Sequence, residues 1–124
     1  MYRDLLGVKF KPHGRTVKEG LDCIGVLLEV FKRDGIKLID PWYDSLDVLS
    51  DEDFWRKFNN QFKKIERPVE KCVVEIFSHY SKKGHVAVYI GNGMIIHTTV
   101  RTGVCIEPLS RYEHKIEGYY SVSN

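Results

Sequence analysis

Residues 20–26 read Gly-Leu-Asp-Cys-Ile-Gly-Val, and the residues that follow continue with the apolar spacing of an amphipathic helix. The residues at i, i+3, i+4 and i+7 are Ile24, Leu27, Leu28 and Phe31. Asp22 is of a type that caps helix N-termini, and Gly35 favours the left-handed turn that ends a helix. We therefore predict a helix over residues 23–34, with Cys23 in its first turn.

The thiol of Cys23 would face the free backbone N–H groups and the positive dipole end of this helix, which favour a thiolate. A helix N-terminus stabilises an anion by at most about 1–2 kcal/mol, and one pKa unit corresponds to about 1.4 kcal/mol. We expect the helix to lower the pKa of Cys23 by roughly one unit. Because such a sulfur is only partly ionised at neutral pH, a nucleophilic role requires a basic neighbour, normally a histidine.

Composition limits the classes of function. The chain has 124 residues, 43% of them hydrophobic and 29% charged, which is typical of a soluble protein forming a single domain over residues 1–124. The net charge of +2 argues against nucleic-acid binding, and no apolar run is long enough for membrane insertion. Residues 1–7 lack the apolar segment of a signal peptide, so we expect synthesis in the cytoplasm without export by the general secretory route.

The three cysteines, Cys23, Cys72 and Cys105, are an odd number at wide spacing. This pattern is unlike a disulfide framework or a Cys-x-x-Cys metal site. We expect free thiols, with Cys72 and Cys105 as inert core residues of strands.

Two further helices are predicted in the first half of the chain. Residues 2–7 are compatible with a short helix closed by Gly7. Ser50 begins a capping-box-like sequence rich in acids, and an apolar stripe follows it until Pro68. The stripe consists of Phe54, Trp55, Phe58, Phe62 and Ile65. We interpret this second segment as a structural helix whose aromatic face packs on the core.

The second half of the chain is rich in β-branched and aromatic residues, which predicts strands. They are expected over residues 72–77, 85–90, 94–99, 103–107 and 116–122. Because helices come first and strands follow, the expected fold class is α+β, with N-terminal helices packed on an antiparallel sheet of about five strands.

Gly91-Asn92-Gly93 separates two of these strands and indicates a β-hairpin. With a two-residue Asn92-Gly93 turn, His85 and His97 would point to opposite faces of the hairpin. With a three-residue loop, His85 would lie diagonally across from His97 on the same face, close enough for the two rings to meet. Since Gly93 suits the left-handed position that ends such a loop, we predict the three-residue loop and a His85–His97 pair.

Cys23, His85 and His97 then form a candidate nucleophile, general base and base-orienting group. A zinc site built from the same three side chains is an alternative, since three protein ligands with an open fourth position suit zinc. Their wide separation in the sequence is unlike the short ligand spacing of structural zinc sites, so we expect no metal there.

Three motifs resemble those of the NlpC-type cell-wall cysteine peptidases, which belong to the papain-like superfamily. They are the stretch at residues 20–26, Gly-His-Val-Ala-Val-Tyr-Ile-Gly-Asn-Gly at 84–93, and Ile-His at 96–97. The resemblance spans about residues 5–120. It implies a triad of Cys23, His85 and His97 that cuts peptide bonds in peptidoglycan stems, commonly next to D-glutamate, without metal or cofactor.

Within that family the chain looks most like the branch found in phage tails and prophages. The residues behind this impression are Gly14-Arg15 before the cysteine motif and Gly118-Tyr119-Tyr120 near the end. The resemblance implies action at the bacterial cell wall or as part of a virion. Peptidoglycan peptides would be the substrate, and phage tail proteins are candidate partners.

Two positions depart from the family pattern. Phe10 stands where many members have a tyrosine whose hydroxyl reaches the active site, and Lys71-Cys72 replaces a Gly-Asp pair ahead of the first sheet strand. The candidates for substrate contact lie in or just before the cysteine motif, or in the loop after the first helix. They are Phe10, His13, Asp22, Trp42 and Tyr43.

Two other functions are compatible with the same residues. One is an acyltransferase or amidase that uses the same triad and acyl-thioester on another substrate. The other is a non-catalytic phage tail or wall-binding component that keeps the fold.

Overall fold

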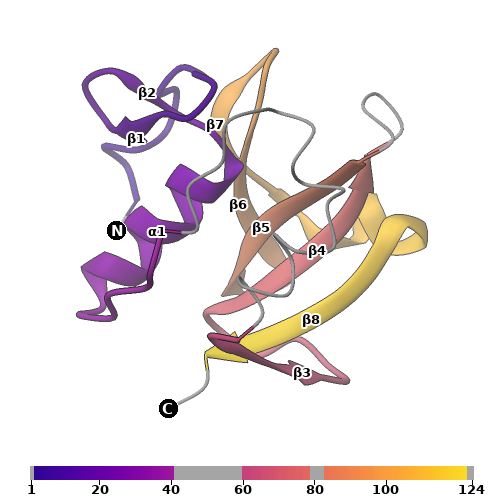
Figure 1. The fold of residues 1–124 in the computed structure, drawn as a ribbon. Helices are drawn as coiled ribbons and strands as arrows, with labels where there is room; N and C mark the ends of the chain where they lie inside the picture. Colours follow the sequence, from indigo (N-terminus) through magenta and orange to yellow (C-terminus); the bar gives the residue numbers. More distant parts are fainter. Residues whose placement is uncertain (1, 41–59, 79–82, 123–124) are drawn as a thin grey trace.

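A computed structural model describes residues 2–40, 60–78 and 83–122 and contains a six-stranded antiparallel sheet (Figure 1). The strands follow the order β3-β8-β4-β5-β6-β7 across the sheet. Their bounds are Phe62–Ile65 for β3, Cys72–Ser78 for β4, Lys83–Gly91 for β5, Met94–Thr99 for β6, Gly103–Pro108 for β7 and Ile116–Val122 for β8. The α+β class and the strands of the second half are therefore confirmed.

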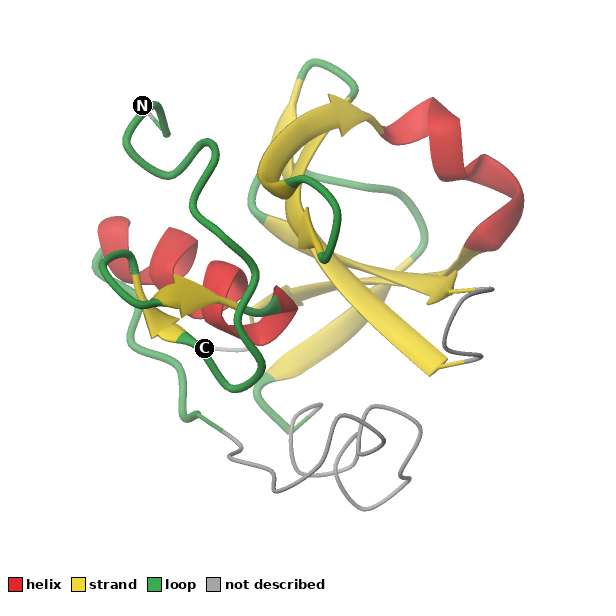
Figure 2. Ribbon diagram, turned by 90° about the horizontal axis from the view of Figure 1, so that it is seen from above, coloured by secondary structure: helices red, strands yellow, loops and turns green. Residues whose placement is uncertain are grey.

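In the described part of the chain, two helices lie on opposite sides of this sheet (Figure 2). The α-helix α1, Cys23–Arg33, packs against β5 and β6, and the 3₁₀ helix η2, Leu109–Lys115, packs against β4 and β7. A small two-stranded sheet of β1, Arg15–Thr16, and β2, Gly20–Leu21, lies against α1 (Figure 1). None of the described helices is long and apolar enough to cross a membrane.

The central strands are buried on both faces because successive side chains alternate between the two covered faces. On one face, strand residues pack with the apolar stripe of α1; they are Val73, Val86, Val88, Ile96 and Val104. On the other face, strand residues pack with Leu109 and Tyr112 of η2; they are Cys72, Val74, Ile76, Ala87 and Ile95. This two-sided burial explains why the strands read as nearly continuous apolar runs.

The helix α1 begins and ends where its capping residues predict. The Asp22 side chain accepts a hydrogen bond from the backbone N–H of Gly25 at 2.8 Å, which satisfies a free donor of the first turn. At the other end, Gly35 adopts a positive φ of 77°, the conformation that commonly ends a helix. Lys32 and Arg33 in the last turn complement the helix dipole.

The predicted helix around residues 51–65 is wrong for its last part, because Phe62–Ile65 forms β3 and pairs with β8. Phe62 still belongs to the core and lies 6.5 Å from Phe31, measured between ring centroids. In a strand, Phe62 and Ile65 point to opposite faces, and each joins the apolar cluster on its own side of the sheet. Pairing with a distant strand thus outweighs the local helical spacing. Residues 50–59 lie outside the described residues.

The short helix predicted over residues 2–7 is also wrong. The backbone N–H of Leu5 donates to Tyr2 O and that of Val8 donates to Leu5 O, so this segment forms successive turns. Tyr2 and Leu5 are buried in the core beside α1. Burial of these two side chains positions the segment without a helix.

Lys71 adopts a left-handed backbone conformation with φ of 69°. Glycine accommodates this conformation without a steric penalty, whereas a lysine adopts it at a cost. The lysine side chain binds Asp34 through an ion pair of 2.8 Å and also donates to the Tyr2 hydroxyl. Its backbone N–H donates to Tyr89 O at 2.7 Å. These contacts hold the turn that leads into β4.

Candidate active site

Cys23 lies at the first residue of α1 and is 6% exposed. The preceding Asp22 is almost completely buried, and its carboxylate accepts hydrogen bonds from at least three groups in the described part of the chain. The donors are the backbone N–H groups of Gly25 at 2.8 Å and His13 at 3.1 Å, and Arg15 Nη1 at 2.8 Å. Asp22 therefore fixes the helix start to the segment that precedes it and determines where the thiol lies.

Gly25 is needed because the helix approaches the backbone of residue 14 very closely. A Cβ added to Gly25 would lie 2.2 Å from Gly14 O, and a Cβ added to Gly14 would lie 2.3 Å from Gly20 O. Real Cβ atoms do not come this close to a carbonyl oxygen. Gly14 and Gly25 thus allow the β1–β2 sheet to pack directly against the first turn of α1.

The structure joins His85 and His97, because His85 Nε2 lies 2.8 Å from His97 Nδ1. The pair was predicted, but the predicted three-residue loop is wrong. Gly91 pairs directly with Met94, so Asn92 and Gly93 form a two-residue turn. Both turn residues have positive φ, 55° and 75°, as a type I′ turn requires.

A bulge explains why this turn still leaves the two histidines on one face. The pairing register shifts between Tyr89 and Gly91, so that Val88 faces Ile96 and Tyr89 faces Ile95. The extra residue of a β-bulge changes which side chains oppose one another beyond it. Beyond the bulge, β5 and β6 therefore pair in the register that a three-residue loop would produce, although the turn itself has two residues.

Glu107 on β7 sets the tautomers of the histidine pair, and the sequence interpretation missed it. His97 Nε2 lies 3.3 Å from Glu107 Oε1. A carboxylate only accepts, so the His97 Nε2–H donates and Nδ1 is left as an acceptor. His85 Nε2–H must then donate to His97 Nδ1, which leaves the lone pair of a neutral His85 on Nδ1.

Glu107 is itself held by three further donors. The Tyr112 hydroxyl donates to Oε2 at 2.9 Å, Arg111 Nη1 donates to Oε2 at 3.2 Å, and the Cys105 thiol donates to Oε1 at 3.3 Å. Although burial opposes its ionisation, the hydrogen bonds from Tyr112 and Cys105 lower the pKa of Glu107. Period-two alternation along β7 could have indicated this residue, since Cys105 is paired with His97 and Glu107 follows two positions later.

The surroundings of Cys23 favour a neutral thiol, contrary to the expected decrease of its pKa. Burial raises the pKa of Cys23 to about 12, and the Asp22 carboxylate acts in the same direction. The backbone N–H groups of Val86 and Ile24 and the Arg15 guanidinium lower it, as expected at a helix N-terminus. Removal of the sulfur from water outweighs these contributions.

The imidazole of His85 is also neutral. The pKa of His85 is lowered to about 3, chiefly by burial. Electrostatic repulsion from a protonated His97 also lowers this pKa, whereas the Glu107 carboxylate raises it. Burial lowers the pKa of His97 as well. A neutral His85 agrees with the tautomer that the hydrogen bonds require.

Cys23 lies beside β5, because the backbone N–H of Val86, the residue after His85, is close enough to hydrogen-bond to the Cys23 sulfur and lowers its pKa. Among the described residues, the side-chain hydrogen bond of His85 runs to His97 and none joins His85 to Cys23. The roles of Cys23 as nucleophile and His85 as base therefore stay predictions.

The predicted substrate contacts lie in different surroundings. Phe10 is partly buried and forms an isolated bridge with Leu21 of β2. His13 is partly buried and has a positive φ of 62°. Trp42 and Tyr43 lie outside the described residues.

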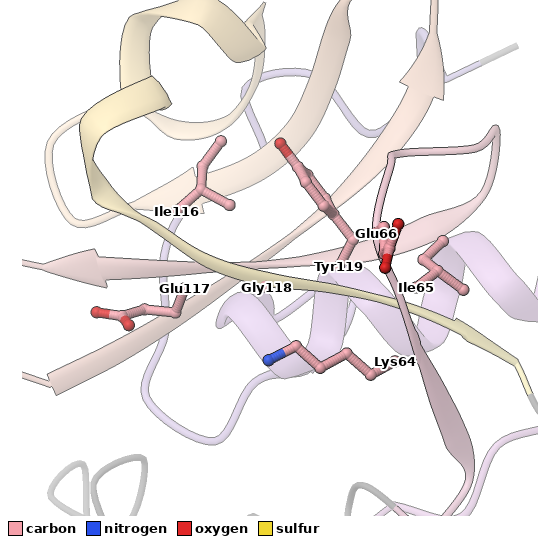
Figure 3. Close-up of a pocket in the computed structure, with 7 residues that line it drawn as sticks. All are labelled: Lys64, Ile65, Glu66, Ile116, Glu117, Gly118 and Tyr119. Carbon is pink, nitrogen blue, oxygen red and sulfur yellow. The ribbon is translucent and has the colours of Figure 1, made fainter.

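A hollow of about 570 Å³ lies elsewhere, along β3 and β8 (Figure 3). It is lined by Lys64, Ile65, Glu66, Ile116, Glu117, Gly118 and Tyr119. Cys23, His85 and His97 do not line it, so it is separate from the candidate active site.

Comparison with known sequences finds related proteins over most of the chain. A family model described as the NlpC/P60 family matches residues 7–117. The chain is 26% identical over 111 residues to the protein named murein DD-endopeptidase MepS/murein LD-carboxypeptidase of Escherichia coli strain K12. The match covers 88% of this chain and 52% of that protein, so the chain spans about half the length of the curated relatives it matches.

Solved structures with the same fold include a protein similar to a lipoprotein of the NLP/P60 family from Staphylococcus aureus subsp. aureus Mu50. It has a TM-score of 0.67 at 19% identity, over 97% of this chain and 38% of that chain. An NlpC/P60 family protein from Bacillus cereus ATCC 10987 has a TM-score of 0.66 at 22% identity, over 93% and 35%. The NlpC/p60 domain of the peptidoglycan hydrolase SagA has a TM-score of 0.63 at 16% identity, over 98% and 92%.

Proposed function

Because the chain belongs to the NlpC/P60 family, we propose that it is a cysteine peptidase that hydrolyses peptidoglycan stem peptides with Cys23, His85 and His97. The observation that supports this proposal is the chain of hydrogen bonds that links His85 to His97 and His97 to Glu107. It leaves a bare lone pair on His85 Nδ1, and a general base needs such a lone pair.

In the proposed reaction, His85 Nδ1 removes the proton of the Cys23 thiol as the sulfur attacks the carbonyl carbon of the substrate. Since the thiol and the imidazole are both neutral beforehand, proton transfer accompanies the attack. The Cys23 backbone N–H at the start of α1 donates to the oxyanion. His85 then returns the proton to the leaving amine, and a water molecule, activated by the same base, hydrolyses the acyl-thioester.

His97 and Glu107 act on this reaction through His85. As His85 accepts the thiol proton it becomes positively charged, and a neutral acceptor at His97 Nδ1 together with the Glu107 carboxylate stabilises that charge. His97 therefore has the orienting role that an acidic or amide residue has in other triads.

The names of the relatives support the substrate. MepS is named a murein endopeptidase and carboxypeptidase, and SagA a peptidoglycan hydrolase. We extend this substrate class to the present chain and propose action at the bacterial cell wall. Association with phage tail proteins stays a prediction from sequence resemblance.

The alternatives make different products. An acyltransferase would form the same acyl-thioester but pass it to another acceptor, and an amidase would hydrolyse a substrate other than the stem peptide. A non-catalytic wall-binding component would leave every peptide intact. Incubation with purified stem peptides, followed by mass spectrometry, separates the peptidase from the other functions: cleavage by the peptidase adds water, transfer adds the acceptor, and neither an amidase for another substrate nor a binding protein changes the mass.

The experiment compares wild type with Cys23→Ala and His85→Ala. Both variants should lose cleavage, and wild type should show a transient mass increase on Cys23 from the acyl group. His114→Ala is a matched control for loss of a histidine, because the His114 side chain is 93% exposed. Absence of cleavage by wild type, or equal cleavage by Cys23→Ala, would refute the peptidase.

A further inference from the structure

A second set of reactive side chains lies on the far side of His97 from His85. Cys105 is the direct cross-strand partner of His97, and Glu107 lies two residues further along β7. Because strand residues two apart share a face, all three side chains converge. Their ligand atoms, one from each residue, lie within 4.8 Å of one another.

The separations are close to those of a zinc coordination shell. Zinc bonds of about 2.0–2.3 Å in a tetrahedron place the ligand atoms about 3.3–3.8 Å apart. Glu107 Oε1 lies 3.3 Å from His97 Nε2 and 3.3 Å from Cys105 Sγ. The remaining pair, His97 Nε2 and Cys105 Sγ, lies within 4.8 Å and would close by at most about 1.3 Å to reach the roughly 3.5 Å expected in that shell.

The donor types favour zinc over other common cations. Thiolate and imidazole ligands suit zinc, whereas calcium and magnesium prefer sites made of oxygen atoms alone. Solvent reaches the site from the side of Cys105, which is only partly buried, and of Glu107, whose side chain is 15% exposed, whereas His97 is buried behind them. Three protein ligands leave a fourth position for water.

We propose that Zn²⁺ binds between His97 Nε2, Cys105 Sγ and Glu107 Oε1 and inhibits the peptidase. This set differs from the zinc site considered from the sequence, with which it shares only His97. The inhibition rests on the proposed function, whereas the binding does not.

Inhibition follows from the tautomers of the histidine pair. A metal on His97 Nε2 displaces the proton from that nitrogen, and the neutral ring then carries its proton on Nδ1. His97 Nδ1–H must now donate to His85 Nε2, so the His85 proton moves to Nδ1. No proton is gained or lost by the pair, and the Cys105 thiol releases one proton to solvent as it becomes a thiolate ligand. His85 Nδ1 then has no lone pair for the Cys23 proton.

Binding is tested on the reduced full chain with Co²⁺ as a spectroscopic substitute for zinc. Wild type and Cys23→Ser should bind one ion with thiolate-to-cobalt absorption, and Zn²⁺ should displace it. Cys105→Ser should lose that absorption and bind Zn²⁺ at least about tenfold more weakly, which is the smallest effect expected even for an outer partner of a zinc ligand. Equal binding by Cys105→Ser, or loss of binding in Cys23→Ser, overturns the site.

If Cys105→Ser does not fold, alkylation of wild type gives the same information. Zn²⁺ should protect Cys105 from iodoacetamide, as mapped by mass spectrometry of peptides. Unchanged alkylation of Cys105 at saturating Zn²⁺ overturns the site.

Inhibition is measured as the ratio of cleavage with and without Zn²⁺ for each variant against its own metal-free rate. Wild type should be inhibited at the concentration at which Cys105 binds zinc, and Cys105→Ser should require at least about tenfold more. Equal inhibition of both refutes the mechanism. Zinc binding at Cys105 in a chain without peptidase activity would refute the proposed function and leave the metal site standing.

Discussion

Replacing Gly25 with alanine should destabilise the protein, although it removes a glycine from a helix. The new Cβ would lie 2.2 Å from Gly14 O and 3.2 Å from Leu21 Cδ2. Ordinary contacts are about 3.5 Å or longer, so the helix start and the preceding loop must separate by more than about 1 Å. Gly14 O is a backbone atom that accepts from the Asp22 N–H, and no side-chain rotation can relieve the contact.

Two opposing contributions determine the sign of the change in stability. Alanine is favoured over glycine within a helix by up to about 1 kcal/mol. Overpacking of a rigid contact costs about 1–3 kcal/mol. We expect a net loss of about 1–2 kcal/mol in the free energy of unfolding, which corresponds to a decrease of about 4–8 °C in Tm.

Thermal unfolding followed by circular dichroism measures this change. The control is Gly35→Ala at the other end of α1, where a Cβ would meet nothing within 4 Å but φ is 77°. We expect a loss of about 1 kcal/mol or less there, from the backbone conformation alone. The folded Gly25→Ala protein should also lose peptidase activity, by up to about 100-fold, because Cys23 moves with the helix start.

An unchanged or increased Tm for Gly25→Ala would refute this reasoning. It would mean that helix propensity dominates and that the close approach to Gly14 does not constrain the cysteine-bearing turn.

Glu107→Gln removes the negative charge of the carboxylate that accepts the His97 hydrogen bond, so kcat/KM should decrease about tenfold. The ¹⁵N NMR spectrum of the imidazole rings should show altered tautomers. An unchanged spectrum would contradict the role assigned to Glu107. Above about pH 9 the Cys23 thiol of the unfolded chain ionises, whereas that of the folded chain, with a pKa of about 12, keeps its proton. The free energy of unfolding of wild type should therefore decrease by about 1.4 kcal/mol for each pH unit, relative to that of Cys23→Ser. Parallel curves in urea titrations of the two proteins would refute burial of the thiol. Asp22→Ala removes a helix cap and the buried ion-pair partner of Arg15, so the free energy of unfolding should decrease by about 2–4 kcal/mol. Glu19→Ala removes an exposed ion pair and should lower the free energy of unfolding by less than about 1 kcal/mol. Equal urea midpoints for the two variants would contradict this expectation.

Several elements were predictable from the sequence because their causes are local. The helix α1 depends on an apolar spacing, on the Asp22 cap and on Gly35, all within fifteen residues of one another. The strands of the second half follow from runs of β-branched residues. The His85–His97 pair was predicted for an incorrect reason, since a bulge and a short turn have the same effect on register as a longer loop.

Only the tertiary structure determined the features that depend on distant segments. Phe62–Ile65 forms a strand because β8 supplies its hydrogen-bond partners, and Glu107 reaches the histidines because β7 is the neighbour of β6. Helix position alone predicts a more acidic Cys23 thiol, yet burial by the packed chain makes that thiol less acidic. Local patterns determine which residues are available for chemistry, whereas desolvation and strand order, which arise only on folding, determine their charge and their partners.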